Sequence, residues 1–152
     1  MKMLQNLLFV DDESHVRKFI STLVHKVYPG ITLHEASSCA AALDLFQQVK
    51  PELVLLDINM PGVDGFATLK LLKALDASCE VIMLTSIDIG RTVQTVIEIG
   101  AAGYIHKDCD YREMEASVTA LVQRLFPEWS MQEESVVVSE QSAPPESDPP
   151  EA

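Results

Sequence analysis

Apolar residues along this chain alternate between two kinds of spacing. Short continuous apolar runs, typical of strands buried on both faces of a sheet, occupy residues 4–10, 53–56, 81–84 and 103–105, and residues 31–35 alternate as a further strand. Between these runs, apolar residues recur every three or four positions, as on one face of an amphipathic helix. Five strand–helix alternations of this kind predict an α/β domain with parallel strands.

The helical stretches carry their own start and stop signals. The clearest apolar stripe consists of Val16, Phe19, Ile20, Leu23, Val24 and Val27. We expect Ser14 to cap this first helix, Ser37 or Ser38 to cap the second, and Gly100 to end the fourth. Right-handed crossovers would then place helices on both faces of a doubly wound five-stranded sheet that ends near residue 126.

The third and fifth helices are marked by their own apolar residues. The third follows a Pro61-Gly62 turn. Its apolar residues are Phe66, Leu69, Leu72 and Leu75. The last helix carries Met114, Val118, Leu121, Val122 and Leu125. Both patterns complete the predicted (βα)5 order.

Residues 127–152 differ in composition from the rest of the chain. They hold seven of the 23 acids, five of the eight prolines and no Lys or Arg, which leaves 16 acids against 11 bases in residues 1–126. The net charge of −12 therefore divides into −5 and −7. Such a composition predicts a mostly disordered acidic Pro/Ser-rich tail, and the overall acidity argues against direct contact with nucleic acid.

Cysteine usage and hydropathy indicate a cytoplasmic protein. The three cysteines, Cys39, Cys79 and Cys109, are odd in number and lack metal-binding spacing, which favours reduced thiols. No apolar run approaches the roughly 20 residues of a membrane span. The first apolar run ends directly in acids and has no cleavage site, so the pattern of a signal peptide is missing.

Polar side chains follow four of the expected strands. Asp11 and Asp12 come after the first strand, Asp57 after the third, Thr85 after the fourth and Lys107 after the fifth. Parallel strands bring their carboxyl ends to one edge of a sheet, where ligands bind in this class of fold. Taken singly, such residues are more often turn formers, helix caps or solvated charges. Five of them at one edge predict a shared site.

Several carboxylates in one crevice repel one another unless a cation lies between them. Oxygen ligands suit Mg²⁺, and the histidines and cysteines have no zinc-like spacing. The Lys107 ammonium and the Thr85 hydroxyl would complement a phosphoryl group beside such a metal. Because a carboxylate can attack phosphorus to give an acyl phosphate, these residues predict a phosphate-accepting site at Asp57.

Four stretches of this sequence resemble the receiver domain of bacterial two-component response regulators. They are Val10-Asp11-Asp12, Leu55-Leu56-Asp57-Ile58-Asn59-Met60-Pro61-Gly62-Val63-Asp64-Gly65, Leu84-Thr85-Ser86 and Gly100-Ala101-Ala102-Gly103-Tyr104-Ile105-His106-Lys107. The resemblance covers residues 4–126 and implies a flavodoxin-like receiver fold. It also implies that Asp57 accepts phosphate from a sensor histidine kinase or phosphotransfer protein. Such a chain is a phosphoacceptor that catalyses its own phosphorylation and slow dephosphorylation, not an enzyme with separate substrates.

The resemblance implies a metal-binding role for four residues. Asp12 would bind Mg²⁺ directly, Asp11 mainly through water and Asn59 through its backbone carbonyl, beside Asp57 itself. Asn59 and Ile87 lie where side chains of this family affect how fast water reaches the aspartyl phosphate. The bulky apolar side chain of Ile87 leads us to expect slow self-dephosphorylation.

The resemblance also implies a conformational switch. Thr85 and Lys107 would bind phosphoryl oxygens, and Tyr104 would move inward with Thr85, reshaping the face made by the fourth helix, fifth strand and fifth helix. One departure is Asp108, where many receivers have proline. The Lys-Asp pair resembles receivers of helix-turn-helix transcriptional regulators and places Asp108 and Asp110 at the start of the fifth helix, where negative charge is favourable.

Other functions remain open. An Asp-nucleophile phosphatase needs an acid two residues after the nucleophile, where this chain has Asn59, which cannot transfer a proton. A flavin phosphate would be repelled by the acidic loop after the first strand. A receiver-like interaction module that is never phosphorylated would need none of the five site residues, yet all are present.

What lies downstream is also open. No output domain is evident after Phe126, so the chain is either a stand-alone receiver, which we favour, or a receiver fragment of a DNA-binding regulator. The kinase, the downstream partner and any phosphorylation-linked homodimer are not readable from the sequence.

Overall fold

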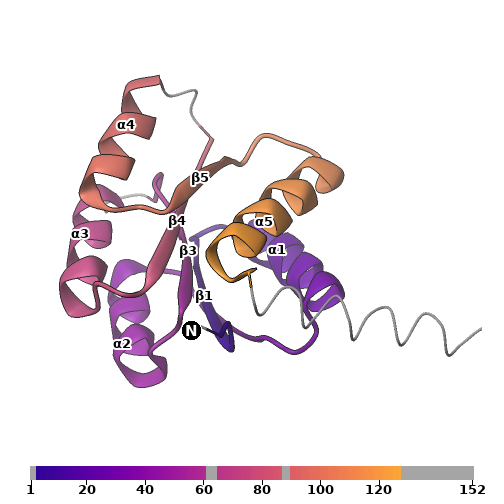
Figure 1. Ribbon diagram of the computed structural model, residues 1–152, viewed down its shortest axis with the longest axis horizontal. Coiled ribbons are helices and arrows are strands. Elements are labelled where there is room, and N and C mark those ends of the chain that lie inside the picture. Colours follow the sequence, from indigo (N-terminus) through magenta and orange to yellow (C-terminus); the bar gives the residue numbers. More distant parts are fainter. Residues whose placement is uncertain (1–2, 61–64, 87–89, 128–152) are drawn as a thin grey trace, which may run out of the picture.

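In the computed structural model, which describes residues 3–60, 65–86 and 90–127, five parallel strands pair in one sheet (Figure 1). The strands are β1 (Asn6–Val10), β2 (Thr32–Ala36), β3 (Leu53–Asp57), β4 (Glu80–Thr85) and β5 (Gly103–His106). Their order is β2-β1-β3-β4-β5, so the chain leaves β1 in one direction to β2 and returns to the other side at β3. This reversal makes the carboxyl ends of β1 and β3 the predicted place for a ligand.

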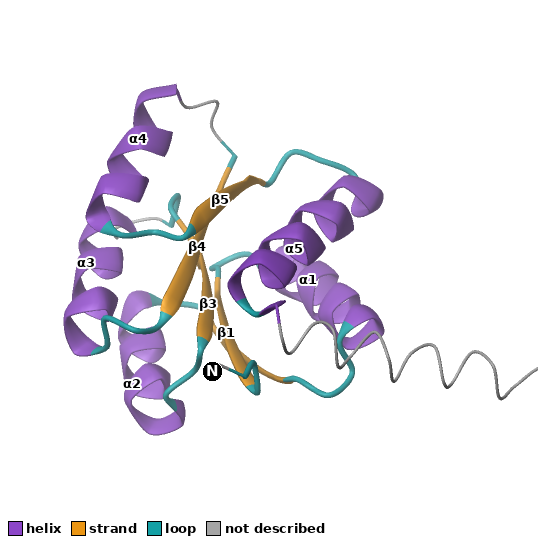
Figure 2. Cartoon of the chain, in the orientation of Figure 1, coloured by secondary structure: helices purple, strands orange, loops and turns teal. Residues whose placement is uncertain are grey.

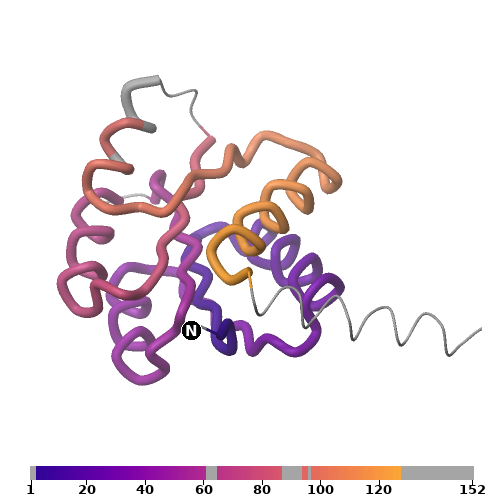
Figure 3. The backbone as a smooth tube through the Cα atoms, in the orientation of Figure 1, coloured from indigo at the N-terminus to yellow at the C-terminus, as the bar shows by residue number. Residues whose placement is uncertain are grey.

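Helices cover both faces of the sheet, as the alternating pattern predicts. They are α1 (Ser14–Val27), α2 (Cys39–Val49), α3 (Gly65–Leu75), α4 (Gly90–Ile99) and α5 (Tyr111–Leu125). Figure 2 shows α1 and α5 on one side of the strands and α2, α3 and α4 on the other. The backbone trace in Figure 3 shows α1 beside α5, where the rings of Phe19 and Tyr111 meet edge to face with centroids 5.4 Å apart.

The core lies in two layers, one on each face of the sheet. All five residues of β3 are buried, and its side chains alternate between the layers. Leu53 and Leu55 join the cluster under α1 and α5, whereas Val54 and Leu56 join the cluster under α2 and α3. Truncating one such leucine to alanine costs about 2–5 kcal/mol, so β3 is a rigid support for the residue that ends it, Asp57.

The predicted helix ends are partly confirmed. The Ser38 hydroxyl caps α2 by accepting a hydrogen bond from the Ala41 amide at 3.1 Å. Gly100 follows α4 with a φ of 124°, a conformation that favours glycine. The expectation that Ser14 caps α1 is wrong: Ser14 is the first helical residue, and Glu13 is the N-cap, without a capping bond from its side chain.

The apolar stripe predicted for α3 holds except at its last residue, since Phe66 packs against the same core cluster. Leu69 and Leu72 are buried, but Leu75 is 48% exposed. Steps of three residues turn 300° around a helix, so each step moves the side chain about 60° off the buried face. By the last turn of α3 the stripe has rotated into solvent.

Several other predictions can be compared with the described residues. Cys39, Cys79 and Cys109 are free thiols, as expected. Among the helices of the described part of the chain, none is long and apolar enough to cross a membrane. The Pro61-Gly62 turn and the acidic tail beyond Pro127 lie outside the described residues.

Candidate functional site

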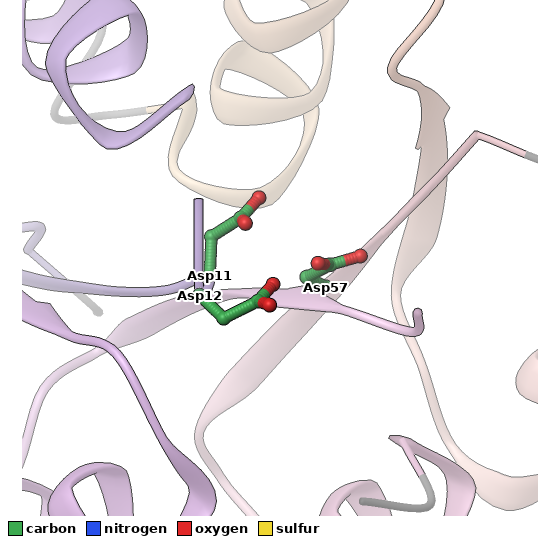
Figure 4. Close-up of side chains that lie close together, drawn as sticks. All are labelled: Asp11, Asp12 and Asp57. Atoms are coloured by element: carbon green, nitrogen blue, oxygen red, sulfur yellow. The ribbon is translucent and has the colours of Figure 1, made fainter. Parts of the chain in front are cut away.

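Three aspartates meet at the carboxyl ends of β1 and β3. Asp11 and Asp12 directly follow β1, and Asp57 is the last residue of β3, next to β1 in the sheet. One carboxylate oxygen from each lies within 4.8 Å of the others (Figure 4). Asp11 and Asp57 are fully buried, whereas Asp12 is exposed. Their closeness concentrates negative charge where solvent can screen it least.

Lys107 supplies the opposite charge from the end of β5. Its backbone amide donates to the Thr85 carbonyl at 2.6 Å, which fixes the start of the side chain. Its Nζ lies 2.9 Å from Asp11 Oδ2, 3.0 Å from Glu13 Oε1 and 3.3 Å from Asp57 Oδ2. Burial works against the charged form, but the bonds to Asp11 and Glu13 and the nearby negative charges outweigh it and raise the pKa of Lys107. The ammonium therefore stays protonated across the physiological range.

The carboxylate of Asp57 is held but not fully neutralised. Its Oδ1 accepts a hydrogen bond from the Asn59 amide at 2.9 Å, and its Oδ2 faces Lys107. Burial raises the pKa of Asp57, and the charge of Asp11 adds to this, while the Asn59 amide and Lys107 act in the other direction. The net upward direction means that the site favours an additional positive charge beside Asp57.

One carboxylate oxygen of Asp11 accepts a hydrogen bond from the backbone, and the other faces the charged cluster. Oδ1 accepts a hydrogen bond from the Glu13 amide at 2.9 Å. Oδ2 is buried, and the Lys107 ammonium lies 2.9 Å from it as an ion pair. Oδ2 therefore already has one cation beside it, and the carboxylate also faces those of Asp12 and Asp57.

The loop after β3 is tied to the end of β4. The Asn59 side-chain oxygen accepts weak hydrogen bonds from the Thr85 hydroxyl at 3.4 Å and from the Ser86 amide at 3.3 Å. The backbone also packs closely here, since a Cβ at Gly65 would come within 2.8 Å of Ile58 Cα. Glycine at the start of α3 therefore permits the tight return of the chain beneath the site.

A groove opens beside the charged cluster. It has a volume of about 390 Å³ and runs between the first turns of α1 and the start of α5. Val16, Phe19 and Met114 form its apolar part, while Glu13 and Lys107 lie at its polar end.

The residues of the cluster fit an oxygen-bound divalent cation. Asp11, Asp12, Glu13 and Asp57 carry four formal negative charges against the single charge of Lys107. The potential metal ligands that lie together are carboxylates, with no His or Cys among them in the described part of the chain. Hard oxygen donors grouped at one place are what such an ion requires.

Residues 7–119 match the sequence model of the family described as "Response regulator receiver domain". The chain belongs to the response regulator receiver domain family. A relative named "Probable transcriptional regulator ycf27" from Guillardia theta is 35% identical over 121 residues, and "Sporulation initiation phosphotransferase F" from Bacillus subtilis is 32% identical over 114 residues. These matches cover 79% and 75% of this receiver chain, but 46% and 90% of the two relatives. The chain thus spans about half the length of the first relative and nearly all of the second.

Solved structures confirm the predicted receiver fold. The signal receiver domain of a DNA-binding response regulator protein (merR) from Colwellia psychrerythraea 34H superposes with a TM-score of 0.70 at 25% identity, covering 78% of this chain and 98% of that one. The chemotaxis protein CheY4 of Vibrio cholerae gives a TM-score of 0.69 with the same coverages. At 22% identity, this second likeness concerns the fold alone.

The receiver fold brings most of the predicted site residues together. Asp11, Asp12, Asp57 and Lys107 form one cluster, and Thr85 borders it through Asn59 and the backbone of Lys107. Tyr104, on β5, is 41% exposed. Ile87 lies outside the described residues.

Sequence reasoning missed Glu13 as a member of this receiver site. Its position after Asp11-Asp12 suggests only the start of α1, yet its carboxylate reaches Lys107. We expected negative charge from Asp108 and Asp110 at the start of α5. This expectation is confirmed for Asp110, which is the N-cap and forms a reciprocal capping box with Glu113. Asp108 instead donates its amide to His106 Nδ1 at 3.2 Å.

Proposed function

We propose that this receiver domain accepts a phosphoryl group on Asp57 and thereby relays a signal in a two-component system. The observation that carries the proposal is the meeting of Asp57 Oδ2 with the Lys107 ammonium, 3.3 Å away, inside a cluster of three aspartates. A buried, negatively charged cluster with one fixed cation is complementary to a metal and a phosphoryl group together.

The proposed transfer is an in-line displacement at phosphorus. An Asp57 carboxylate oxygen attacks the phosphorus of a phosphohistidine, an O–P bond forms and the P–N bond breaks. The electron pair of the P–N bond stays on the imidazole nitrogen of the donor. Lys107 lies on the Oδ2 side of Asp57, and its ammonium would bind the phosphoryl oxygens of the product.

Four residues would hold Mg²⁺ at this site. We assign direct binding to Asp12 and Asp57, binding mainly through water to Asp11 and binding through the backbone carbonyl to Asn59. The exposure of Asp12 and the grouping of the three carboxylates support this assignment. When bound, the ion supplies positive charge that offsets the repulsion between the carboxylates and the incoming phosphoryl group.

The response to phosphorylation would pass through Thr85 and Tyr104. Thr85 would bond a phosphoryl oxygen, and Tyr104 would turn inward to alter the face of α4, β5 and α5. The contact of the Thr85 hydroxyl with Asn59 at 3.4 Å, beside the cluster, and the 41% exposure of Tyr104 support these roles. We also propose that Asn59 and Ile87 tune dephosphorylation and that the bulky Ile87 slows it, to be tested by comparing decay rates of the phosphorylated wild type and Ile87→Ala.

We further propose that residues 1–126 form a cytoplasmic phosphoacceptor domain and that residues 127–152 form an acidic tail. Its phosphoryl donor would be a sensor histidine kinase or a phosphotransfer protein. The name of the Bacillus relative, a phosphotransferase of about the length of this match, supports a function in phosphoryl transfer. The ycf27 relative is named as a transcriptional regulator, which keeps a receiver fragment of a DNA-binding regulator as the second candidate.

Acetyl phosphate with Mg²⁺ provides the test. The full chain should gain a base-labile phosphoryl group, seen as a shift in intact mass, and Asp57→Asn should gain none. Asp44→Asn, which neutralises an exposed aspartate of α2, is the matched control and should label like the wild type. An unlabelled wild type would overturn the proposal, and turnover of an unrelated phosphate ester would favour a phosphatase.

A further inference from the structure

The side chain of Glu13 takes a position that helix capping does not explain. Glu13 is the N-cap of α1, with φ −91° and ψ 115°, but its carboxylate makes no capping hydrogen bond. Its Oε1 instead accepts a hydrogen bond at 3.0 Å from Lys107, 94 positions along the chain. The Glu13 amide is itself anchored to Asp11 Oδ1, so the residue is held at the edge of the phosphoryl site.

Glu13 competes with the aspartates for a single ammonium. Lys107 has three N–H donors and faces three carboxylates, and the distance to Asp57, 3.3 Å, is longer than those to Asp11 and Glu13. The ammonium is thus fully engaged before any phosphoryl group arrives.

We propose that Glu13 is a positioning residue for the reaction at Asp57: it holds Lys107 at the edge of the site and releases it once Asp57 carries a phosphoryl group. The inference rests on the proposed function. Phosphoryl oxygens on Asp57 would compete for the same N–H donors and would repel the Glu13 carboxylate. Lys107 therefore exchanges Glu13 for the phosphoryl group, and the strength of the Glu13 contact opposes phosphorylation.

Removing the charge of Glu13 should have two effects of opposite sign. Glu13→Gln removes one negative charge from the mouth of the site, so the Kd for Mg²⁺ should rise about threefold. With Mg²⁺ saturating, the same variant should accept phosphate from acetyl phosphate about three to ten times faster, since Lys107 is less restrained and the anionic donor less repelled. A merely structural defect would weaken both properties.

The matched control is Glu35→Gln. Glu35 lies in β2 at the same edge of the sheet and is also an exposed acid in an ion pair, but its partner is Arg17, 3.4 Å away, and not Lys107. The substitution makes the same change in net charge. We expect Glu35→Gln to match the wild type in both measurements within about twofold.

The experiment uses the full chain as wild type, Glu13→Gln and Glu35→Gln. Isothermal titration calorimetry gives the Kd for Mg²⁺, and intact mass against time gives the phosphorylation rate at several acetyl phosphate concentrations. Equal or slower labelling of Glu13→Gln at saturating Mg²⁺, or an equal gain in Glu35→Gln, would overturn the role of Glu13. A wild type that takes up no phosphate would overturn the proposed function instead, and the role of Glu13 with it.

Discussion

The two edges of the sheet hold carboxylates in opposite electrostatic settings. At the amino edge, just before β3, Glu52 Oε1 accepts hydrogen bonds from the amides of Gln5 and Asn6 at 2.9 and 2.8 Å. At the carboxyl edge, Asp11 and Asp57 face each other and share the ammonium of Lys107. Backbone amides of the fold satisfy the carboxylate of Glu52, whereas negative charge remains in excess at the carboxyl edge.

This difference separates an acid that the fold satisfies from acids whose charge the fold leaves in excess. Glu52, just before β3, accepts hydrogen bonds from neutral amides at the start of β1 and so links the two strands. Its carboxylate therefore gains nothing from a ligand. The carboxyl edge carries a repulsion between carboxylates that a divalent cation would relieve, and without such an ion this repulsion lowers the stability of the fold. Three substitutions test whether the two edges differ in this way.

Replacing Lys107 with methionine should have the largest effect on stability. The change leaves Asp11 and Asp57 buried without their counter-charge, and breaking such a pair costs about 3–5 kcal/mol. Because Lys107 is itself 10% exposed, we expect a loss at the lower end, roughly 3 kcal/mol, in urea unfolding with EDTA. Mg²⁺ should recover part of it. A loss below about 0.5 kcal/mol would show that the ammonium does not stabilise the cluster.

Replacing Glu52 with alanine should have a smaller effect on stability, and this effect should not depend on Mg²⁺. Two backbone amides lose their carboxylate acceptor, which costs about 1–2 kcal/mol for partly exposed groups. Urea unfolding with and without Mg²⁺ measures the loss, and labelling by acetyl phosphate should match the wild type. A Glu52→Ala protein whose stability loss changed with Mg²⁺ would break the contrast between the two edges.

Replacing Asp57 with asparagine should stabilise the protein, by about 1 kcal/mol at pH 7 in EDTA. Burial, with the charge of Asp11, raises the pKa of Asp57, so the ionised carboxylate destabilises the native state above that pKa. Below the ordinary value of 3.8 the carboxyl is neutral in both states and this cost is absent. Urea unfolding should therefore show the advantage of Asp57→Asn shrinking as the pH falls toward 4. An asparagine variant less stable than the wild type at pH 7 would contradict this sign.

The sequence predicted the fold and most of the site because both follow from local patterns. The apolar run of β3 ends at Asp57, and strand direction alone then carries Asp11, Thr85 and Lys107 to the same edge. These predictions needed only the order of strands and helices, not the direction of any side chain. The acid pair and the lysine were therefore found without knowledge of their contacts.

What the sequence could not predict depends on side-chain direction. Glu13 stands beside an acid pair and at a helix start, and either setting explains an acid there. Its contact with Lys107 spans 94 positions and depends on where α1 begins relative to β5. The wrong cap at Ser14 has the same origin, since one residue of shift at a helix start is invisible in the apolar stripe.

The central claim is that Asp57, among four neighbouring acids, is the residue that carries phosphate. The most direct test maps the label: the phosphorylated chain is reduced with borohydride, which converts an aspartyl phosphate to homoserine, and digested peptides are sequenced by mass spectrometry. We predict homoserine at position 57, with Asp11, Asp12 and Glu13 unchanged. Homoserine at Asp11 or Asp12, or an unmodified Asp57 in a labelled chain, would contradict the account.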